Sequence, residues 1–161
     1  MQKIFDKILF LKDKYQSNIV FDTRLLKQND IFIGIGDGSK NGGLYYKEAL
    51  KKGSRLLIIN NKTINHEYII HTKNIQSFIK KFCKYLLSKY KGKVIAITGS
   101  VGKTTIKENI YNILSKNNFS VSRSYKNYNN LLGLQFSIMN INLQNKYSIF
   151  ELGVNHPGEM K

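Results

Sequence analysis

The sequence predicts an α/β protein in two parts, a small N-terminal α/β domain over residues 1–91 and an incomplete parallel-sheet domain over residues 92–161. Short apolar runs bounded by glycine, asparagine or aspartate are typical of strands. Between them lie segments whose apolar residues recur every three or four positions, as on one face of a helix. In the C-terminal part strands and helices alternate, which indicates βαβ units and hence a parallel sheet.

The N-terminal part is predicted to contain short strands, a glycine-rich loop and a short helix. Residues 30–35 form a β-branched and aromatic run that leads into glycines, which favours a strand. The continuous apolar run from Leu56 indicates a buried strand, and Gly53 ends the helix before it. The predicted elements are strands over residues 18–22, 30–35, 56–60 and 68–71, a loop over residues 34–43 and a helix over residues 45–52.

A longer helix closes the N-terminal part. Asn74 can cap it, and its buried face is marked by apolar residues at three- and four-residue spacing, namely Ile75, Phe78, Ile79, Phe82 and Leu86. Cys83 lies beside this stripe and is interpreted as a small core residue rather than a reactive thiol. The helical pattern fades over residues 88–92, where we place the domain boundary.

The C-terminal part has a regular alternation of elements. The predictions are strands over residues 93–98, 119–122 and 147–152, and helices over residues 103–115 and 131–140. Three strands leave such a sheet incomplete, and nothing after Pro157 is long enough to add another. Either another chain covers the sheet or the sequence is a piece of a longer protein, and we favour the second explanation.

Composition excludes several classes of protein. The 161 residues carry 26 Lys and Arg against 10 Asp and Glu, a formal net charge of +16. The lysines are scattered, which favours a solvated surface with a modest attraction for anions over specific nucleic-acid binding. No apolar run approaches the ~20 residues that span a bilayer, and no export signal is recognised. With its single cysteine, the chain is expected to be cytoplasmic, without membrane insertion.

Residues 98–105, Thr-Gly-Ser-Val-Gly-Lys-Thr-Thr, have the parts of a nucleotide phosphate-binding loop (P-loop), and ATP is the expected ligand. Two glycines let phosphate oxygens approach, and the helix start behind them attracts an anion. The lysine adds a charge for the β- and γ-phosphates, and the threonine after it a hydroxyl for Mg²⁺. The predicted nucleotide-binding residues are Thr98, Gly99, Ser100, Val101, Gly102, Lys103, Thr104 and Thr105.

The alternative for this segment is an ordinary glycine turn before a helix that happens to begin Lys-Thr-Thr. Ile97 also stands where the common motif has its first glycine. The coincidence of strand, glycine turn and amphipathic helix argues against chance.

Glu151 is predicted to be the acid on the metal side of the site. It ends the apolar strand that begins at Tyr147. A carboxylate at the end of a strand beside a phosphate-binding loop is well placed to act on the Mg²⁺ of a nucleotide. A solvated glutamate at a strand end is the alternative. Thr104 and Glu151 are therefore the predicted metal ligands.

Three segments resemble the Mur ligases, the ATP-dependent enzymes that build the peptide stem of the bacterial cell wall. They are residues 99–108 (Gly-Ser-Val-Gly-Lys-Thr-Thr-Ile-Lys-Glu), residues 127–133 (Asn-Tyr-Asn-Asn-Leu-Leu-Gly) and residues 151–159 (Glu-Leu-Gly-Val-Asn-His-Pro-Gly-Glu). That family uses the same shortened phosphate loop. The N-terminal segments over residues 21–24 and 29–33 are similar to its uridine-binding domain, although Gly43 stands where relatives usually carry a histidine.

The resemblance implies a UDP-binding N-terminal domain and a P-loop ATPase domain, of which residues 92–161 are a part. Asn-His-Pro-Gly-Glu is similar to the branch of the family that joins D-alanyl-D-alanine to UDP-N-acetylmuramoyl-tripeptide through an acyl phosphate, with ATP and Mg²⁺. The full-length enzyme is expected to be a monomer. Later parts of the family's site, a histidine and a lysine near the metals, are not in this sequence, so we expect no ligation by this chain alone.

The resemblance also assigns roles to individual residues. Catalytic roles fall to Lys103, Glu151 and His156. The substrate-binding residues are Asp22, Thr23 and Arg24 on the UDP portion, and Asn127, Asn129, Asn130 and Asn155 near the phosphates and the mouth of the site. Plain loop roles are the alternative for the asparagines and the histidine, as a strand-end turn is for residues 22–24. Lys107 and Glu108 are interpreted as structural, or as support for the residues that contact ligand.

Other functions stay open. One is a stand-alone module that binds a nucleotide or a UDP-sugar without ligation. A second is another ligase of this fold, of the Mur or folylpolyglutamate-synthase-like kind, although Asn-His-Pro-Gly-Glu argues against it. A basic nucleic-acid binder is the third.

Overall fold

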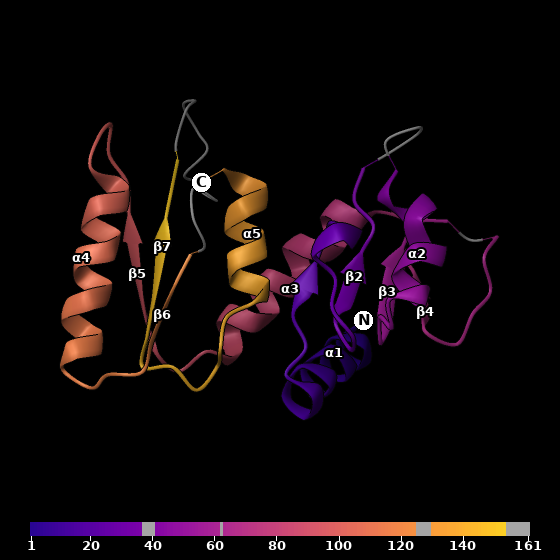
Figure 1. The fold of residues 1–161 in the computed structure, drawn as a ribbon, viewed down its shortest axis with the longest axis horizontal. Helices are drawn as coiled ribbons and strands as arrows, with labels where there is room; N and C mark the ends of the chain where they lie inside the picture. The colour runs from indigo at the N-terminus through magenta and orange to yellow at the C-terminus, as the bar shows by residue number, and fades with distance from the viewer. Residues whose placement is uncertain (37–40, 62, 125–129, 154–161) are drawn as a thin grey trace. The chain divides into compact units, whose positions relative to one another are not determined.

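The computed structural model describes residues 1–36, 41–61, 63–124 and 130–153. The chain forms two compact units, Met1–Phe82 and Cys83–Lys161, whose elements are labelled in Figure 1. The division falls inside helix α3 (Ile75–Lys89), whereas the predicted boundary follows that helix. No helix of the described ranges is long and apolar enough to cross a membrane.

The first unit is built on a parallel sheet. Among its described residues four strands pair side by side in the order β1-β2-β3-β4. The strands are β1 (Ile19–Val20), β2 (Ile31–Ile33), β3 (Leu56–Ile59) and β4 (Ile69–His71). The other elements are α1 (Gln2–Tyr15), the 3-10 turns η1 (Thr23–Leu25) and η3 (Gly42–Tyr45), and α2 (Tyr46–Lys51), with α3 after the last strand. The predicted α/β class with a parallel sheet is confirmed.

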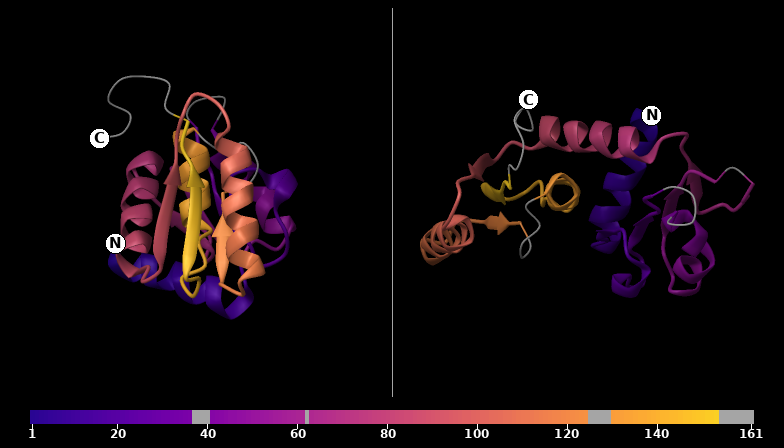
Figure 2. Two further views of the ribbon diagram at one scale, coloured as in Figure 1. Left: turned by 90° about the vertical axis from the view of Figure 1, so that its left-hand side faces the viewer. Right: turned by 90° about the horizontal axis from the view of Figure 1, so that it is seen from above.

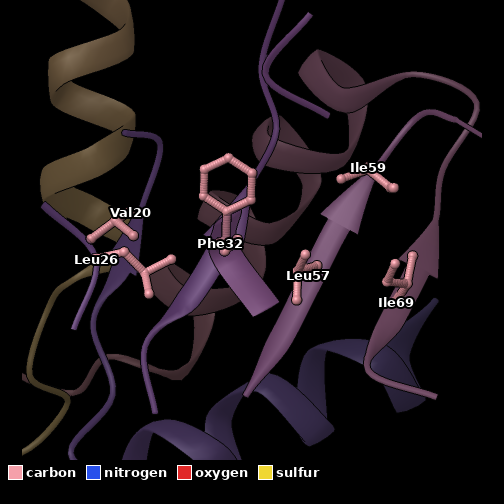
Figure 3. Close-up of a cluster of buried hydrophobic side chains, with 7 residues drawn as sticks. Val20, Leu26, Phe32, Leu57, Ile59 and Ile69 are labelled. Atoms are coloured by element: carbon pink, nitrogen blue, oxygen red, sulfur yellow. The ribbon is translucent and has the colours of Figure 1, made fainter. Parts of the chain in front are cut away.

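The core of this unit lies against the central strands. Every residue of β2 and β3 is buried, as expected for parallel strands covered on both faces. One face carries the cluster drawn in Figure 3, made of Val20, Leu26, Phe32, Ala49, Leu57, Ile59 and Ile69. Because side chains alternate along a strand, Ile31 and Ile33 point to the opposite face.

Helix α1 was not among the predicted elements. Its buried residues Phe5, Ile8 and Leu11 have the three-residue spacing of a helix face. The signal is masked because Phe10 is apolar but 59% exposed, and because Met1 at the N-cap provides no side-chain hydrogen bond. The Phe5 ring packs edge-on against Phe78 of α3, with 5.5 Å between centroids.

Helix α3 follows its prediction closely. The five residues predicted to form its buried face are all buried, and so is Cys83. Burial raises the pKa of the Cys83 thiol to about 12, so this cysteine is a core residue and a poor nucleophile. The side chain of Asn74 accepts a hydrogen bond from the Ser77 N–H at 2.7 Å, which confirms the predicted cap.

We expect Asn74→Ala to lower the free energy of unfolding by about 1 kcal/mol, because an orphan N–H of the first turn loses its acceptor. The measurement is urea unfolding followed by circular dichroism. Lys73→Ala, at the exposed position just before the cap, is the matched control and should change little. Equal unfolding midpoints for the two variants would contradict the capping role.

The second unit is a smaller parallel sheet with helices on both faces. Its elements are β5 (Lys93–Ile97), α4 (Lys103–Lys116), β6 (Val121–Arg123), α5 (Leu131–Met139) and β7 (Tyr147–Glu151). Within the described residues the strand order is β5-β7-β6. The chain therefore passes from β5 to the far edge and returns to the centre. Helices α4 and α5 lie on opposite faces (Figures 1 and 2), as right-handed crossovers in opposite directions require.

Strand β6 begins later than predicted. Helix α4 is followed by Asn118 in a left-handed conformation (φ 60°), and the Phe119 N–H donates back to the Leu114 carbonyl. These helix-end contacts hold Phe119 out of the sheet, so the strand covers residues 121–123 instead of residues 119–122. The carboxyl ends of all three strands nevertheless meet at one edge, which is where ligands bind in open parallel sheets.

Candidate functional site

The turn between β5 and α4, residues 98–102, is open to solvent. Gly99 (φ 148°) and Gly102 (φ 77°) adopt backbone conformations that other residues rarely take. A Cβ atom at Gly102 would meet no described atom within 4 Å, and Val101 is 88% exposed. The turn is therefore accessible to a ligand and is not packed against protein.

The first turn of α4 is suited to an anion. Its N-cap, Gly102, has no side chain to accept a hydrogen bond, and no acidic residue lies in this first turn. The leading N–H groups of a helix lack internal partners and lie at the positive end of its dipole. Together they form a ready site for phosphate oxygens.

The Lys103 ammonium lies over the same turn. Its Nζ donates to the Gly99 carbonyl at 2.6 Å and is 3.4 Å from the Ser100 carbonyl. The amine thus contacts the loop instead of extending away from it. A phosphate seated on the turn would meet a full positive charge there.

Thr104 and Glu151 meet at the carboxyl edge of the sheet. Glu151 ends β7, pairs with Ile97 of β5 and is 2% exposed. The Thr104 hydroxyl donates to Glu151 Oε2 at 2.9 Å. Lys107 Nζ lies 3.3 Å from the same oxygen. A hydroxyl, a carboxylate and an ammonium group are therefore gathered at the start of α4, which follows the glycine turn.

Further contacts fix this group from the sheet and from α4. The Glu151 N–H donates to Ser124 Oγ at 3.1 Å, just after β6. Glu108 lies 3.6 Å from Lys107 and forms an ion pair of 2.9 Å with Arg123. The Arg123 guanidinium lies over the Tyr111 ring, 3.6 Å from its centroid.

The oxygen donors fit a magnesium ion that arrives with phosphates. Within the described ranges, no group of three or more His, Cys, Asp or Glu side chains could hold a metal. Mg²⁺ keeps several waters and is usually held by one or two carboxylates together with substrate phosphates. The pair Thr104 and Glu151 suits that role better than the role of a permanent protein cage.

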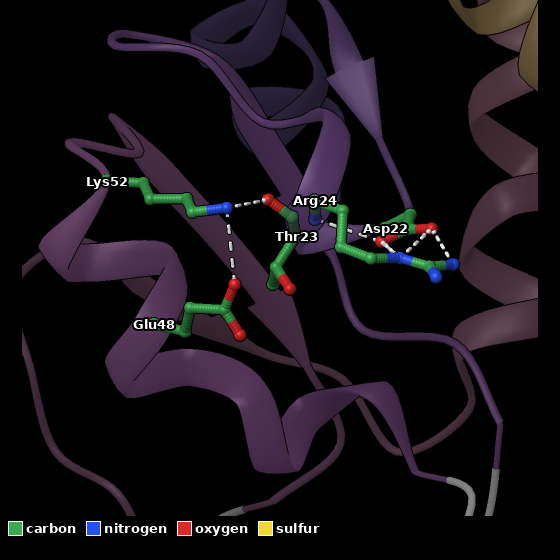
Figure 4. A network of polar contacts seen from close by, with 5 residues as sticks. All are labelled: Asp22, Thr23, Arg24, Glu48 and Lys52. Atoms are coloured by element: carbon green, nitrogen blue, oxygen red, sulfur yellow. Dashed lines mark hydrogen bonds and ion pairs between the residues drawn. The ribbon is translucent and has the colours of Figure 1, made fainter.

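The residues predicted to bind UDP lie together in the first unit (Figure 4), where Arg24 is exposed, Asp22 is partly exposed and Thr23 is buried. Asp22 caps η1, and its carboxylate is paired with Arg24 at 2.6 Å. The Thr23 carbonyl accepts a hydrogen bond of 2.8 Å from Lys52, which also lies 3.3 Å from Glu48. This cluster follows β1 at the carboxyl edge of its own sheet.

Arg24 stabilises the ionised form of the Asp22 carboxyl in this cluster. Its side-chain and backbone hydrogen bonds to Asp22 hold the pKa of that carboxyl below its ordinary value. The Arg24 side chain as a whole remains 86% exposed, so an anionic ligand can reach it from solvent.

Several predicted site residues are placed differently or lie outside the described residues. Asn130 is the N-cap of α5, where its side-chain oxygen accepts the Gly133 N–H at 2.8 Å. The residues predicted on both sides of it, Asn127, Asn129, Asn155 and His156, lie outside the described residues. The asparagine segment therefore contributes at least one structural cap.

The sequence analysis interprets Lys107 as structural or as support for the residues that contact ligand, but it does not place Lys107 against Glu151. This residue is fully buried and contacts the predicted metal-side acid. A usable signal was its position four residues after Lys103 and three after Thr104, which puts all three on adjoining faces of one helix. Ser124 was also missed, because nothing in the sequence indicates which residue supports the end of β7.

Comparisons with known proteins find similar sequences and structures. Residues 97–161 match the family model of the Mur ligase middle domain. The chain is 37% identical over 146 residues to the UDP-N-acetylmuramoyl-tripeptide–D-alanyl-D-alanine ligase of Rickettsia prowazekii, which covers 89% of this chain and 32% of that protein. The ligase of the same name from Buchnera aphidicola is 30% identical over 152 residues. The chain thus spans about a third of the length of these curated relatives.

Solved structures show the same similarity. The MurF ligase of Thermotoga maritima in complex with ADP matches with a TM-score of 0.72 and 30% identity, over 88% of this chain and 33% of that one. MurF from Acinetobacter baumannii matches with a TM-score of 0.76 and 25% identity, over 93% and 36%.

Proposed function

We infer that this chain belongs to the Mur ligase family, and from that premise we propose that it is part of an ATP-dependent ligase that joins D-alanyl-D-alanine to UDP-N-acetylmuramoyl-tripeptide. The observation that carries the proposal is the meeting of Thr104 and Glu151 beneath an open glycine turn and its lysine. The similarity to ligases of that name supports the choice of substrates.

In this proposal the second unit binds ATP. The N–H groups of residues 99–105 surround the phosphates, as in a P-loop, and Lys103 moves from the Gly99 carbonyl to a phosphate oxygen. Thr104 and Glu151 would hold Mg²⁺, which when bound would offset negative charge on the phosphates. The Thermotoga maritima relative was solved in complex with ADP, which supports the proposal that this chain binds an adenine nucleotide.

The reaction requires two anions to approach each other. The γ-phosphoryl of ATP is transferred to the terminal carboxylate of the tripeptide, which gives an acyl phosphate. The amino group of D-alanyl-D-alanine then attacks this carbonyl, and phosphate leaves. Lys103 and the turn N–H groups offset the negative charge gathered in the first step, where electrostatic stabilisation contributes most. His156 and the asparagines Asn127, Asn129, Asn130 and Asn155 are proposed to orient the substrates.

The first unit binds the UDP portion of the substrate in this proposal. An arginine guanidinium recognises phosphate oxygens through paired N–H groups, and Arg24 offers an exposed one beside Asp22 and Thr23. The two nucleotide sites therefore lie in separate units and depend on different residues.

We expect Arg24→Ala to weaken binding of UDP-N-acetylmuramic acid by about tenfold, as for the loss of one charge-assisted contact, while ATP binding stays unchanged. Isothermal titration of the full chain with each ligand is the measurement. Lys51→Ala, which removes an exposed cation from α2, controls for the general basic charge. The UDP assignment fails if Arg24→Ala weakens both ligands equally, or neither.

A further inference from the structure

The buried lysine of α4 has no role in the proposed function. Lys107 is 0% exposed, and neither phosphate binding nor metal binding requires an ammonium group at that depth. Burying a lysine is costly unless it is paired with an opposite charge. Its position against Glu151 therefore needs an explanation.

Lys107 and Thr104 act on the same atom. Lys107 Nζ lies 3.3 Å from Glu151 Oε2, and the Thr104 hydroxyl donates to that oxygen at 2.9 Å. Three residues apart on one helix, the two side chains adjoin. The carboxylate of Glu151 is therefore held in direction by two side chains of α4, while the Ser124 contact on its backbone N–H holds the end of β7.

The surrounding charges are arranged in pairs. Glu151 and Glu108 each lie within 4 Å of Lys107, and Arg123 pairs with the far oxygen of Glu108. These four side chains contribute two positive and two negative charges. A divalent cation that approaches Glu151 without phosphates would therefore meet a carboxylate whose charge is already offset.

We propose that Lys107 is a positioning residue that aims the Glu151 carboxylate at Thr104 and, as a buried counter-charge, keeps free divalent metal from binding until nucleotide phosphates are present. This inference rests on the proposed function in one respect, the assignment of Glu151 to the metal side. Metal and nucleotide would then enter as one complex, because the phosphates supply negative charge in addition to that of Glu151, which Lys107 offsets.

The test is Mn²⁺ binding to the full chain, followed by electron paramagnetic resonance, without nucleotide and with ADP. Without nucleotide, Lys107→Met should bind Mn²⁺ at least about tenfold tighter than the unmodified chain, because a unit charge a few ångströms from the ion is removed. Lys116→Met, an exposed lysine in the last turn of the same helix, should leave the affinity unchanged. A purely structural role for Lys107 would lower stability without raising Mn²⁺ affinity, so equal affinities overturn the inference.

The unmodified chain gives a second test that does not depend on the variant folding. Its Mn²⁺ affinity should rise at least about tenfold when ADP is added, since the phosphates add the missing charge. Equal Mn²⁺ affinity with and without ADP also overturns the inference. Glu151→Gln distinguishes a failure of the proposed metal site from a failure of the inference about Lys107. Undiminished Mn²⁺ binding to that variant with ADP contradicts the proposed metal site itself, whatever Lys107 does.

Discussion

Replacing Lys103 by alanine should weaken ATP binding to the chain by about ten- to a hundredfold, the value of one charge-assisted hydrogen bond or slightly more. In the structure its ammonium lies 2.6 Å from the Gly99 carbonyl, directly over the turn where phosphates would sit. The loss should be larger for ATP than for AMP, because the charge lies near the outer phosphates. Isothermal titration with ATP and with AMP measures the difference.

The matched control for this experiment is Lys116→Ala. Lys116 is an exposed lysine of the same helix, but it lies in the last turn, far along α4 from the glycine turn. The Lys116→Ala substitution removes the same formal charge from a chain of net charge +16, so any general electrostatic effect on ATP binding appears in both variants. Equal losses of ATP affinity in the two variants would show that only diffuse charge attracts the nucleotide.

Glu151→Gln should abolish the strengthening of ATP binding by Mg²⁺. The amide keeps the shape of the side chain but has no anionic oxygen for the metal. It also leaves the buried Lys107 without its nearest carboxylate, and breaking a buried ion pair in this way costs about 3–5 kcal/mol of stability. Titration of ATP with and without Mg²⁺ measures the first effect, and urea unfolding measures the second.

Glu67→Gln makes the same chemical change at an exposed position before β4. It should leave both the Mg²⁺ effect and the unfolding midpoint close to those of the unmodified chain. If Mg²⁺ strengthens ATP binding to the Glu151→Gln variant as much as to the unmodified chain, the metal assignment of Glu151 is wrong.

The strands and most helices could be predicted because their signals are local. The all-apolar run of β3 and the spaced face of α3 each lie within one short window of sequence. Helix α1 was not predicted, because the exposed apolar residue Phe10 interrupts the apolar pattern of its buried face. The start of β6 was misplaced because the contacts that end α4, including the left-handed Asn118, are not visible in a strand pattern.

The candidate site was partly predictable for the same reason. The glycine turn, Lys103 and Thr104 are consecutive, so their pattern is readable in the sequence alone. The contact of Thr104 with Glu151 joins residues 47 positions apart and follows only when β7 is known to lie beside β5. The burial of Lys107 depends on that same pairing: its spacing from Lys103 and Thr104 indicates an adjoining helix face, but does not show that the side chain is enclosed.

Amide chemical-shift changes during titration of the isotope-labelled chain with MgATP, at physiological salt, test the central claim most directly. We predict that the largest changes fall on Gly99, Ser100, Gly102 and the first residues of α4, with little change over residues 22–24. Changes spread evenly over exposed lysines, or confined to the first unit, would contradict a phosphate site at the glycine turn.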